Sequence, residues 1–413
     1  MNMIEQARLA KKASASLRNT SSDIRNTVLM EFAKNLVLKQ DEIILANQAD
    51  MQESKDNGMS EAMLDRLLLN EKRIQGMAEG ILQIVQLDDP LHRIIEERDI
   101  PSGIHLKKVS CPIGVIGIIF ESRPNVTADC AALCFKAGNA CVLKGGKESY
   151  RSCLAIVNIF KKALEKSGLD TDLIQLAERP SHAETQQFME CREYVDLLIP
   201  RGGKNLIQAV VKNARVPVIE TGAGVCHTFV DESADLAMAE KIVINAKCSR
   251  PSVCNAMETL LVHEGIADVF LPLIVKALKE NGVIIHGDEK ACSVCNDIDQ
   301  ADEDCWYVEY NRLEMNLKVV KDVNEAISHI TKYSTKHSEC IVTENQENAD
   351  LFMQSIDAAC IYHNASTRFT DGFEFGLGAE IGISTQKLHA RGPMGLRELT
   401  TYTYLLTGKG EIR

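Results

Sequence analysis

The first ninety residues carry apolar positions at steps of three and four, which is the period of an amphipathic helix. The run that contains Ile24, Val28 and Phe32 shows this spacing. A second run follows Asn70, whose short polar side chain suits the N-cap position of a helix. Residues 2–90 are nearly free of proline, and we predict four helices there.

The pattern changes near residue 93, where strand-like runs begin. Two short runs within 94–111 flank the turn Pro101-Ser102-Gly103 and predict a β-hairpin. Val115–Phe120 is continuously apolar, which is typical of a parallel strand buried on both faces. The elements predicted after it are helix 126–138, strand 140–143, helix 149–166, a strand near 173, helix 181–191, strand 195–199, a further helix and strand 216–219. Such alternation predicts a doubly wound parallel sheet.

A second alternating series begins near residue 248. Its predicted strands are 258–262, 282–285, 317–320, 338–342 and 358–362. No Ser- or Gly-rich linker separates the two series, so we predict two α/β domains that pack tightly. The last segment, Leu399–Ile412, alternates like an edge strand and is a candidate oligomer contact.

Composition and charge exclude several classes of protein. The 413 residues are 45% hydrophobic and 25% charged, as in an ordinary globular protein. A net charge of -12 argues against nucleic acid or an anionic membrane as the main partner. The sequence lacks both a long apolar run and a signal-peptide pattern, so we expect a cytoplasmic protein. Its 14 cysteines are then expected to be reduced thiols rather than disulfides.

Cys254 is the candidate nucleophile among these cysteines. It follows Arg250-Pro251-Ser252-Val253, a loop that precedes a regular element. A thiolate near a helix N-terminus and beside an arginine has a lowered pKa, which suits nucleophilic attack. The alternative is that Cys254 is a buried structural cysteine, the usual role of a free thiol.

Two further candidates follow predicted buried strands, where sites form in α/β sheets. Asn125 comes after Arg123 and Pro124, and its amide can donate to a developing oxyanion. The alternative is that Asn125 caps helix 126–138. Glu220 opens the sequence Glu-Thr-Gly-Ala-Gly and can act as a base, with glycines that permit close backbone approach. The alternative is a surface carboxylate before a turn.

The segment Lys144-Gly145-Gly146-Lys147 ends one strand and opens a helix. Two lysines at a helix N-terminus make an anion site suited to ribose hydroxyls or a nucleotide phosphate, although a solvated basic turn also fits. Cys292 and Cys295 have metal-ligand spacing, but no second pair of ligands accompanies them, so we expect no metal. His389 has no partner motif and is expected to be structural.

The order and spacing of these residues resemble the aldehyde dehydrogenase superfamily. The shared pattern is an Asn after the first buried strand, a Lys after the next, Glu-x-Gly-x-Gly, and then a nucleophilic Cys. Within that superfamily the chain is similar to the gamma-glutamyl phosphate reductases over essentially its whole length. The segments that carry the likeness are 120–129, 143–148, 200–203, 245–247, 250–255, 364–372, 378–385 and 388–393. Cys248-Ser249 departs from the Thr-Gln expected before Arg-Pro, but touches no assigned catalytic residue.

The resemblance implies reduction of L-glutamate 5-phosphate to L-glutamate 5-semialdehyde with release of phosphate, the second step of proline biosynthesis. It implies that Cys254 forms a thioester while Asn125 and the Cys254 backbone N–H hold the oxyanion. Glu220 holds the position of the base that activates water in hydrolytic members. Because water would hydrolyse the thioester before it is reduced, we do not expect that role here. The candidates for binding the substrate's anionic groups are Arg123, Arg250 and Arg368.

The resemblance also implies NADP(H) as the cofactor. Many NAD-using members place a Glu three residues after the lysine that ends this strand, where it binds the ribose hydroxyls. In this chain the same step from Lys144 leads to Lys147, and two lysines favour a 2′-phosphate. If the loop shifted by one residue, Glu148 would take the ribose instead. Gly202 and Gly203 are the further cofactor-binding residues that the resemblance implies.

The fold implied is two doubly wound α/β domains plus a small β oligomerisation element. We expect a cofactor-binding domain at 1–247, with hairpin 94–111 as the oligomerisation element and 380–398 returning to this domain. The catalytic domain is expected at 248–379, and 399–413 as the C-terminal oligomerisation strand. A dimer or tetramer and a transient contact with the glutamate 5-kinase are implied. No kinase module precedes the chain, so we expect the stand-alone form.

Two alternatives stay open. One is a hydrolytic aldehyde dehydrogenase that oxidises a semialdehyde to an acid. The arginines near the expected site argue against it, because they suit a phosphate leaving group. The other is a catalytically inactive binding or structural homologue. Retention of Cys254, Asn125 and Lys144 together argues against that.

Overall fold

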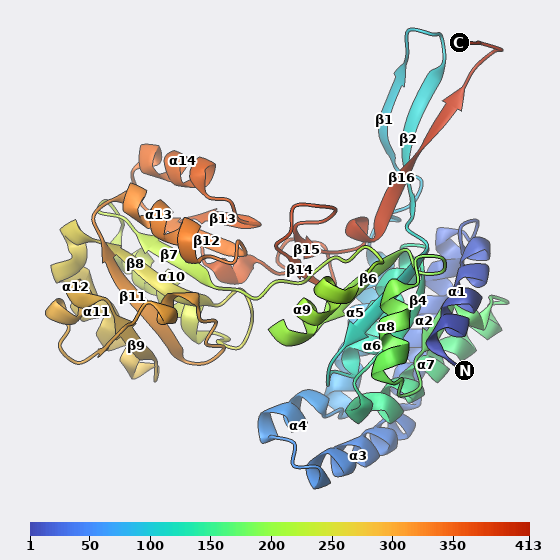
Figure 1. The fold of residues 1–413 in the computed structure, drawn as a ribbon, viewed down its shortest axis with the longest axis horizontal. Coiled ribbons are helices and arrows are strands. Elements are labelled where there is room, and N and C mark those ends of the chain that lie inside the picture. The colour runs from blue at the N-terminus through green and yellow to red at the C-terminus, as the bar shows by residue number, and fades with distance from the viewer. The chain divides into compact units, whose positions relative to one another are not determined.

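The computed structural model describes residues 1–413, with every side chain except that of Ala62. The chain forms two units, each with its own parallel sheet (Figure 1). The first unit comprises Met1–Thr221, Gly376–Gly382 and Met394–Arg413, and the second unit comprises Gly222–Phe375 and Ile383–Pro393. The α/β class predicted from the sequence is confirmed.

Five helices, rather than the predicted four, form the start of the first unit. They are α1 (Met3–Leu17), α2 (Ser22–Leu38), α3 (Gln40–Asp56), α4 (Glu61–Leu67) and α5 (Glu71–Gln86). The count was wrong because Gly58, with a φ of 76°, turns the chain between α3 and the short α4. The predicted N-cap is confirmed, since the Asn70 side chain accepts a hydrogen bond from the Arg73 N–H at 2.9 Å.

A four-stranded parallel sheet forms the centre of the first unit, in the order β5-β4-β3-β6. Its strands are β3 (Val115–Phe120), β4 (Ala140–Lys144), β5 (Ile174–Leu176) and β6 (Leu197–Arg201). The helices between and after them are α6 (Asn125–Lys136), α7 (Tyr150–Lys166), α8 (His182–Glu190) and α9 (Lys204–Asn213). Every residue of β3 is buried, as its unbroken apolar run predicted. In the ladders Ile119 pairs with Lys144 and Phe120 with Arg201, so the loops after β3, β4 and β6 start side by side.

The strand predicted at 216–219 is reduced to one parallel bridge between Val218 and Leu198. The Leu198 N–H donates to the Pro217 carbonyl at 2.8 Å, and the Ile219 N–H donates to the Leu198 carbonyl at 2.9 Å. Pro217 has no N–H of its own, so the ladder cannot extend through it.

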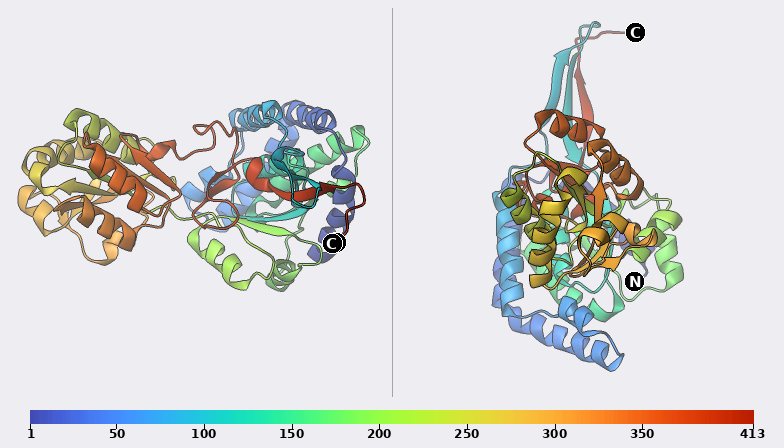
Figure 2. Two further views of the ribbon diagram at one scale, coloured as in Figure 1. Left: turned by 90° about the horizontal axis from the view of Figure 1, so that it is seen from above. Right: turned by 90° about the vertical axis from the view of Figure 1, so that its left-hand side faces the viewer.

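A separate antiparallel ribbon belongs to the first unit. It consists of β1 (Ile94–Asp99), β2 (His105–Pro112) and β16 (Thr400–Thr407), with β2 in the middle. The predicted hairpin and the predicted C-terminal edge strand are therefore both confirmed. The ribbon projects away from the helices of its unit, as Figures 1 and 2 show.

The second unit contains a seven-stranded parallel sheet in the order β10-β9-β11-β8-β7-β12-β13. Its strands are β7 (Cys226–Val230), β8 (Met257–His263), β9 (Ile284–Gly287), β10 (Asp299–Gln300), β11 (Glu314–Val320), β12 (Ser338–Val342) and β13 (Cys360–His363). Its helices are α10 (Leu236–Cys248), α11 (Glu264–Glu280), α12 (Glu289–Val294), α13 (Val323–Tyr333) and α14 (Gln346–Ser355).

Both faces of this sheet are covered. Val230, Leu260 and Val262 belong to the hydrophobic cluster that includes α10 and α11. Their neighbours Phe229 and Leu261 belong to the cluster that includes α13 and α14. Alternate residues of a strand point to opposite faces, so the unbroken apolar runs reflect a sheet between two helical layers.

The unit boundary in the structure lies at Thr221/Gly222 rather than at the predicted 247/248. The reason is β7, which the sequence did not predict and which pairs with β8 and β12 of the second unit. The predicted return of 380–398 to the first unit is also interrupted. Residues 383–393 group with the second unit, where Arg391 and Asp357 form an ion pair at 2.7 Å.

The remaining short elements are β14 (Gly382–Ser384), β15 (Gly392–Met394) and the 3₁₀ turns η1 (Lys147–Ser149), η2 (Thr171–Leu173), η3 (Asp304–Tyr307), η4 (Thr367–Phe369) and η5 (Arg397–Leu399). Among the described residues, no helix has both the length and the apolar character needed to cross a membrane.

Candidate active site

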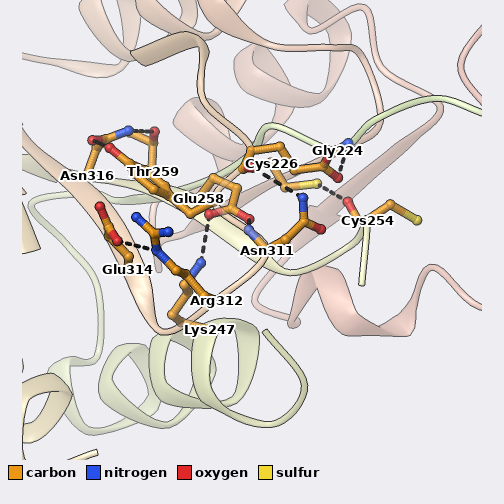
Figure 3. Close-up of polar contacts among 12 residues, drawn as sticks. Gly224, Cys226, Lys247, Cys254, Glu258, Thr259, Asn311, Arg312, Glu314 and Asn316 are labelled. Carbon is orange, nitrogen blue, oxygen red and sulfur yellow. Dashed lines mark hydrogen bonds and ion pairs between the residues drawn. The ribbon is translucent and has the colours of Figure 1, made fainter. Parts of the chain in front are cut away.

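Cys254 lies in the loop between α10 and β8 of the second unit, and its backbone is closely packed. A Cβ atom built at Gly224 would lie 1.5 Å from the Cys254 carbonyl oxygen, so only glycine permits this approach. The buried Cys226 thiol donates to the same oxygen at 3.3 Å. Figure 3 shows the Cys254 side chain extending away from Cys226. The carbonyl is therefore fixed on one side of the loop, and the half-buried thiol lies on the other.

The next residue, Asn255, ties this loop to residues 367–370. Its amide nitrogen donates to the Thr370 carbonyl at 2.8 Å and to the Arg368 carbonyl at 3.3 Å. Its own backbone carbonyl accepts from the Thr367 hydroxyl at 2.7 Å. Asn255 is only 3% exposed, so these bonds form in a site with little competing water.

The Arg368 side chain lies against the loop of the candidate nucleophile. Its guanidinium donates to the Asn255 amide oxygen and, at 3.1 Å, to the Ser249 hydroxyl. Burial lowers the pKa of Arg368, and the nearby positive charge of Arg250 lowers it further, while Asp371 and Cys254 act in the opposite direction. The structure thus brings together three residues proposed from the sequence, namely Cys254, Arg250 and Arg368.

A buried ion pair lies in the same region of the second unit (Figure 3). The Lys247 ammonium, near the end of α10, contacts the Glu258 carboxylate of β8 at 2.7 Å, and both side chains are fully buried. Burial raises the pKa of Glu258 to about 7, although Lys247 pulls it down. Beside the pair, the Glu309 carboxylate accepts from the Gly224 N–H at 2.8 Å. The Asn311 N–H donates to Glu258 at 3.4 Å.

Asn125, in the first unit, is the first residue of α6. The alternative cap role is not found, because the N-cap residue is Pro124 and no side chain caps this helix. The Asn125 amide instead donates to the Asp129 carboxylate at 3.3 Å. Burial raises the pKa of Asp129 to about 6, with Asn125 and Arg201 acting against that rise. The amide is thus held at the edge of the sheet where β3 ends.

Lys144 lies beside two carboxylates at that edge. Burial lowers the pKa of Lys144, the negative charges of Glu148 and Glu121 raise it, and Lys147 lowers it. Glu121 also accepts a hydrogen bond from the Gly203 N–H at 2.9 Å. A Cβ at Gly202 would lie 2.5 Å from the same carboxylate. The proposed cofactor residues after β4 and β6 are therefore linked through Glu121.

Glu148 and Lys147 face different surroundings. The Glu148 carboxylate accepts from the Ser122 N–H at 3.0 Å and from the Ser122 hydroxyl at 2.5 Å, whereas Lys147 is exposed. A small pocket adjoins them. It is lined by Gly145, Gly146, Lys147, Tyr150, Cys153, Leu176, Ala177 and Arg179. The Arg179 guanidinium lies 5.6 Å from the centre of the Tyr150 ring.

The other sequence candidates are distributed between the units. Arg123 and Glu220 belong to the first unit, and His389 belongs to the second. Cys292 lies in α12, where its thiol donates to the Gly287 carbonyl at 3.5 Å, and Cys295 is buried just after that helix. Among the described residues, no cluster of His, Cys, Asp and Glu could hold a metal ion.

A sequence model of the aldehyde dehydrogenase family matches residues 2–309, which is most of the chain. The chain belongs to the aldehyde dehydrogenase family. It is an oxidoreductase, like the curated relatives that it matches over its whole length. A gamma-glutamyl phosphate reductase of Clostridium beijerinckii is 53% identical over 411 residues, covering 100% of this chain and 99% of the relative. One from Carboxydothermus hydrogenoformans is 52% identical with the same coverage.

Solved structures agree with this assignment. The crystal structure of a gamma-glutamyl phosphate reductase from Thermotoga maritima is 46% identical, with a TM-score of 0.98 and coverage of 100% of both chains. A glyceraldehyde-3-phosphate dehydrogenase from Methanocaldococcus jannaschii, crystallised with NADP, is 17% identical with a TM-score of 0.70. It covers 98% of this chain and 94% of its own, and at that identity it supports the aldehyde dehydrogenase fold alone.

Several residues of the candidate sites were not predicted from the sequence. Asn255 and Glu121 lie within segments that carried the resemblance, each next to an assigned residue or strand end. Glu258 lies in a strand that was predicted, but the neighbouring sequence did not indicate that it is buried opposite Lys247. An acidic residue inside an apolar strand, four positions after a candidate nucleophile, was the only available indication.

The Lys247–Glu258 pair predicts a pH-dependent stability effect. Lys247→Met leaves the Glu258 carboxylate buried without its partner, which should lower the unfolding free energy by about 3–5 kcal/mol at about pH 8. A group whose pKa is raised by folding stabilises the protein below its unfolded pKa and loses that contribution as the pH rises through its folded pKa. The pKa of Glu258, already about 7 with Lys247 present, rises further without it. The loss should therefore shrink towards about pH 6, where the carboxyl is protonated.

Urea denaturation at the two pH values measures this effect. Lys241→Met, an exposed change on the same helix, is the matched control and should alter stability little. A loss in Lys247→Met that is equally small at both pH values would show that the buried pair does not carry the energy assigned to it.

Proposed function

We propose that the chain reduces gamma-glutamyl phosphate, that is L-glutamate 5-phosphate, to L-glutamate 5-semialdehyde with release of inorganic phosphate. This is the second step of proline biosynthesis from glutamate. The observation that carries the proposal is the pair of arginines, Arg250 and Arg368, beside Cys254. Guanidinium groups suit a carboxylate or phosphate by bidentate pairing. The names of the 51–53% identical relatives support the same reaction.

Cys254 is the proposed nucleophile. Its thiolate attacks the acyl-phosphate carbonyl, and the C–O bond to phosphate breaks as the thioester forms. The Cys254 backbone N–H and the Asn125 amide are the proposed donors to the oxyanion of the tetrahedral stage. Reduction of the thioester gives a thiohemiacetal, whose collapse releases the aldehyde and regenerates the thiol. Glu220 keeps its place in the family pattern, but activation of water would hydrolyse the thioester, so no such role is proposed.

The residues of the first unit fit a nicotinamide cofactor. Gly145, Gly146, Gly202 and Gly203 lie at the carboxyl edge of the sheet, and a side chain added at Gly146 or Gly202 would collide with a glutamate. When bound, reduced nicotinamide supplies a hydride. Lys144 and Lys147 are the proposed partners of an adenosine 2′-phosphate, which makes NADPH the preferred form.

The hydrogen bonds of Glu148 support the preference for NADPH. A carboxylate that accepted from the ribose hydroxyls would repel a 2′-phosphate. Here the Glu148 carboxylate accepts from Ser122, while Lys147 is exposed. The cationic residue is thus the one presented to solvent.

The decisive assay runs the reaction in both directions. With gamma-glutamyl phosphate generated in situ, the protein should consume NADPH and release phosphate in equal amounts. In the reverse direction, oxidation of the semialdehyde should require inorganic phosphate. A phosphate-independent oxidation to glutamate would instead identify a hydrolytic aldehyde dehydrogenase, and no turnover in either direction would indicate an inactive homologue.

Replacement of the nucleophile should abolish this activity. Cys254→Ala should lower kcat by on the order of 10⁴-fold or more, because no other group forms the thioester. Cys254→Ser should also be nearly inactive, since a hydroxyl is a much weaker nucleophile than a thiolate at neutral pH. Fluorescence titration should show NADPH binding unchanged in both variants. Near-normal turnover of Cys254→Ala would refute covalent catalysis by this residue.

Charge reversal at Lys147 should change cofactor preference. Lys147→Glu should weaken NADPH by about 1–3 kcal/mol, the scale of one charge-assisted hydrogen bond, and should affect NADH much less. Lys162→Glu, an exposed reversal on α7, is the matched control and should leave kcat/KM unchanged for both cofactors. Equal kcat/KM for NADH and NADPH in the unmodified protein would contradict the proposed role of the lysines.

The ribbon β1-β2-β16 is the proposed oligomer contact for a dimer or tetramer. Leu405 and Leu406, on opposite faces of β16, are 51% and 56% exposed, and β16 is an edge strand. Exposed apolar side chains on an unpaired edge favour association.

A transient contact with the glutamate 5-kinase is proposed as well. Co-sedimentation of the two enzymes tests it, and independent sedimentation counts against it.

Aspartates on β16 should therefore disrupt the assembly. The double variant Leu405→Asp/Leu406→Asp should sediment as a monomer in analytical ultracentrifugation. Lys409→Asp, just beyond the strand, is the control and should sediment like the unmodified protein. If the double variant retains the original oligomer, the contact lies elsewhere.

A further inference from the structure

The bonds of Arg368 differ from those of two other buried cations, Lys247 and Arg25, and resemble those of the buried Lys136, whose ammonium also donates to neutral oxygens. The Lys247 ammonium pairs with Glu258, and the Arg25 guanidinium pairs with Asp89 at 2.5 Å. The Arg368 guanidinium donates only to neutral oxygens, the amide of Asn255 and the hydroxyl of Ser249. Among the described residues it forms no ion pair. Its positive charge is therefore positioned by hydrogen bonds to neutral groups, while the negative charges of Asp371 and Glu374 act on it without an ion pair.

The acceptor in this arrangement is itself held rigidly. The amide nitrogen of Asn255 is used by the carbonyls of Thr370 and Arg368, so the amide oxygen must face the guanidinium. The Thr370 hydroxyl is fixed in turn by Ser338 at 2.6 Å and by Tyr362 at 2.7 Å. A side chain with both bonds of its amide nitrogen satisfied cannot flip without losing them.

Asn255 is also bonded covalently to the candidate nucleophile. The carbonyl of Cys254 is fixed by Gly224 and Cys226, and Asn255 continues the same backbone. The side chain that accepts from Arg368 therefore starts from the backbone position next to Cys254. The isosteric acid, Asp, would bind Arg368 more strongly but would cancel its charge. An amide is the group of this shape that positions a guanidinium and leaves its charge available.

We propose that Asn255 is a positioning residue: its neutral amide oxygen holds the Arg368 guanidinium beside Cys254 and leaves that charge to attract an anionic substrate. The inference rests on the proposed function for the identity of the substrate. The local field that it describes at Cys254 is a property of the free protein, which can be measured without turnover.

Paired alkylating reagents measure that field. Iodoacetate is anionic and iodoacetamide is neutral, so the ratio of their reaction rates at Cys254 reports the local potential. The Cys254 peptide is quantified by mass spectrometry, and the ratio is normalised to that of a free cysteine derivative. In the unmodified protein the normalised ratio should exceed one. Asn255→Asp should lower it about fivefold or more, the effect of one unit charge at about 4 Å in water.

Two further variants make the result decisive. Ser249→Asp neutralises the same guanidinium from an exposed position, so it tests the inference even if Asn255→Asp does not fold. It should lower the ratio in the same direction. Asn324→Asp, an exposed change at the start of α13, adds the same charge to the second unit away from this loop. It should leave the ratio unchanged.

Inorganic phosphate provides an independent probe. It should slow alkylation of Cys254 in the unmodified protein and in Asn324→Asp, but not in Asn255→Asp or Ser249→Asp. In the reductase assay, Asn255→Asp should raise the substrate KM about tenfold or more with a smaller effect on kcat, the sign of lost binding rather than lost chemistry.

An unchanged alkylation ratio in a folded Asn255→Asp, or in Ser249→Asp, would overturn the inference. So would an equal fall in Asn324→Asp, because the effect would then not depend on Arg368. If the ratio falls as expected but the protein does not reduce gamma-glutamyl phosphate, the proposed function fails and the positioning role stands. If reduction proceeds and the ratio does not change, the positioning role fails alone.

Discussion

The close approach of Gly224 to the Cys254 carbonyl is the constraint on which the rest of the candidate site depends. A side chain at Gly224 would occupy the position of that carbonyl oxygen, so the two segments can pack only because one residue lacks a Cβ. The approach fixes the peptide that follows Cys254, and Asn255 extends the fixed region to residues 367–370. The backbone of the candidate nucleophile is therefore held in place on the side of its carbonyl.

Charges are distributed differently in the two units. In the second unit, Lys247 is paired with Glu258. Arg368 and Arg250 lie near Cys254, and among the described residues Arg368 forms no ion pair, although Asp371 and Glu374 oppose the lowering of its pKa by burial. Two guanidinium groups near Cys254 are the reason to propose an anionic substrate, because they suit a carboxylate or a phosphate. In the first unit, Lys144 lies near Glu121 and Glu148, and Glu121 also binds the Gly203 N–H. At that edge the lysine proposed to bind the cofactor therefore lies beside carboxylates.

The sequence predicted the parts of the fold whose hydrophobic pattern is unambiguous. Val115–Phe120 could be recognised because both of its faces are covered. Strand β7 could not be recognised, because His227 and Thr228 are polar yet buried. The buried His227 ring forms a hydrogen bond with the Glu339 carboxylate at 3.0 Å. Glu339 lies more than a hundred residues away in the sequence. That missing strand displaced the predicted domain boundary.

The residues of the candidate site also divide into those that the sequence predicted and those that it did not. Cys254, Asn125 and Lys144 lie directly after strands or in a marked loop, so local sequence together with the family resemblance could propose them. The contacts of Asn255 come from residues 367–370, and no local pattern indicates them. Lys247 and Glu258 likewise form a buried ion pair between a helix and a strand. The spacing of residues in a single sequence does not indicate such a pair.

The central claim is that Cys254 becomes acylated by the substrate, and trapping the acyl-enzyme tests it most directly. The protein is mixed with gamma-glutamyl phosphate without cofactor and quenched in acid, which protonates the substrate α-amine and prevents ring closure. Peptide mass spectrometry then locates the adduct. The account predicts one glutamyl group on Cys254 that disappears when NADPH is added before the quench. A protein that turns over without an adduct on Cys254, or with the adduct on another cysteine, would contradict it.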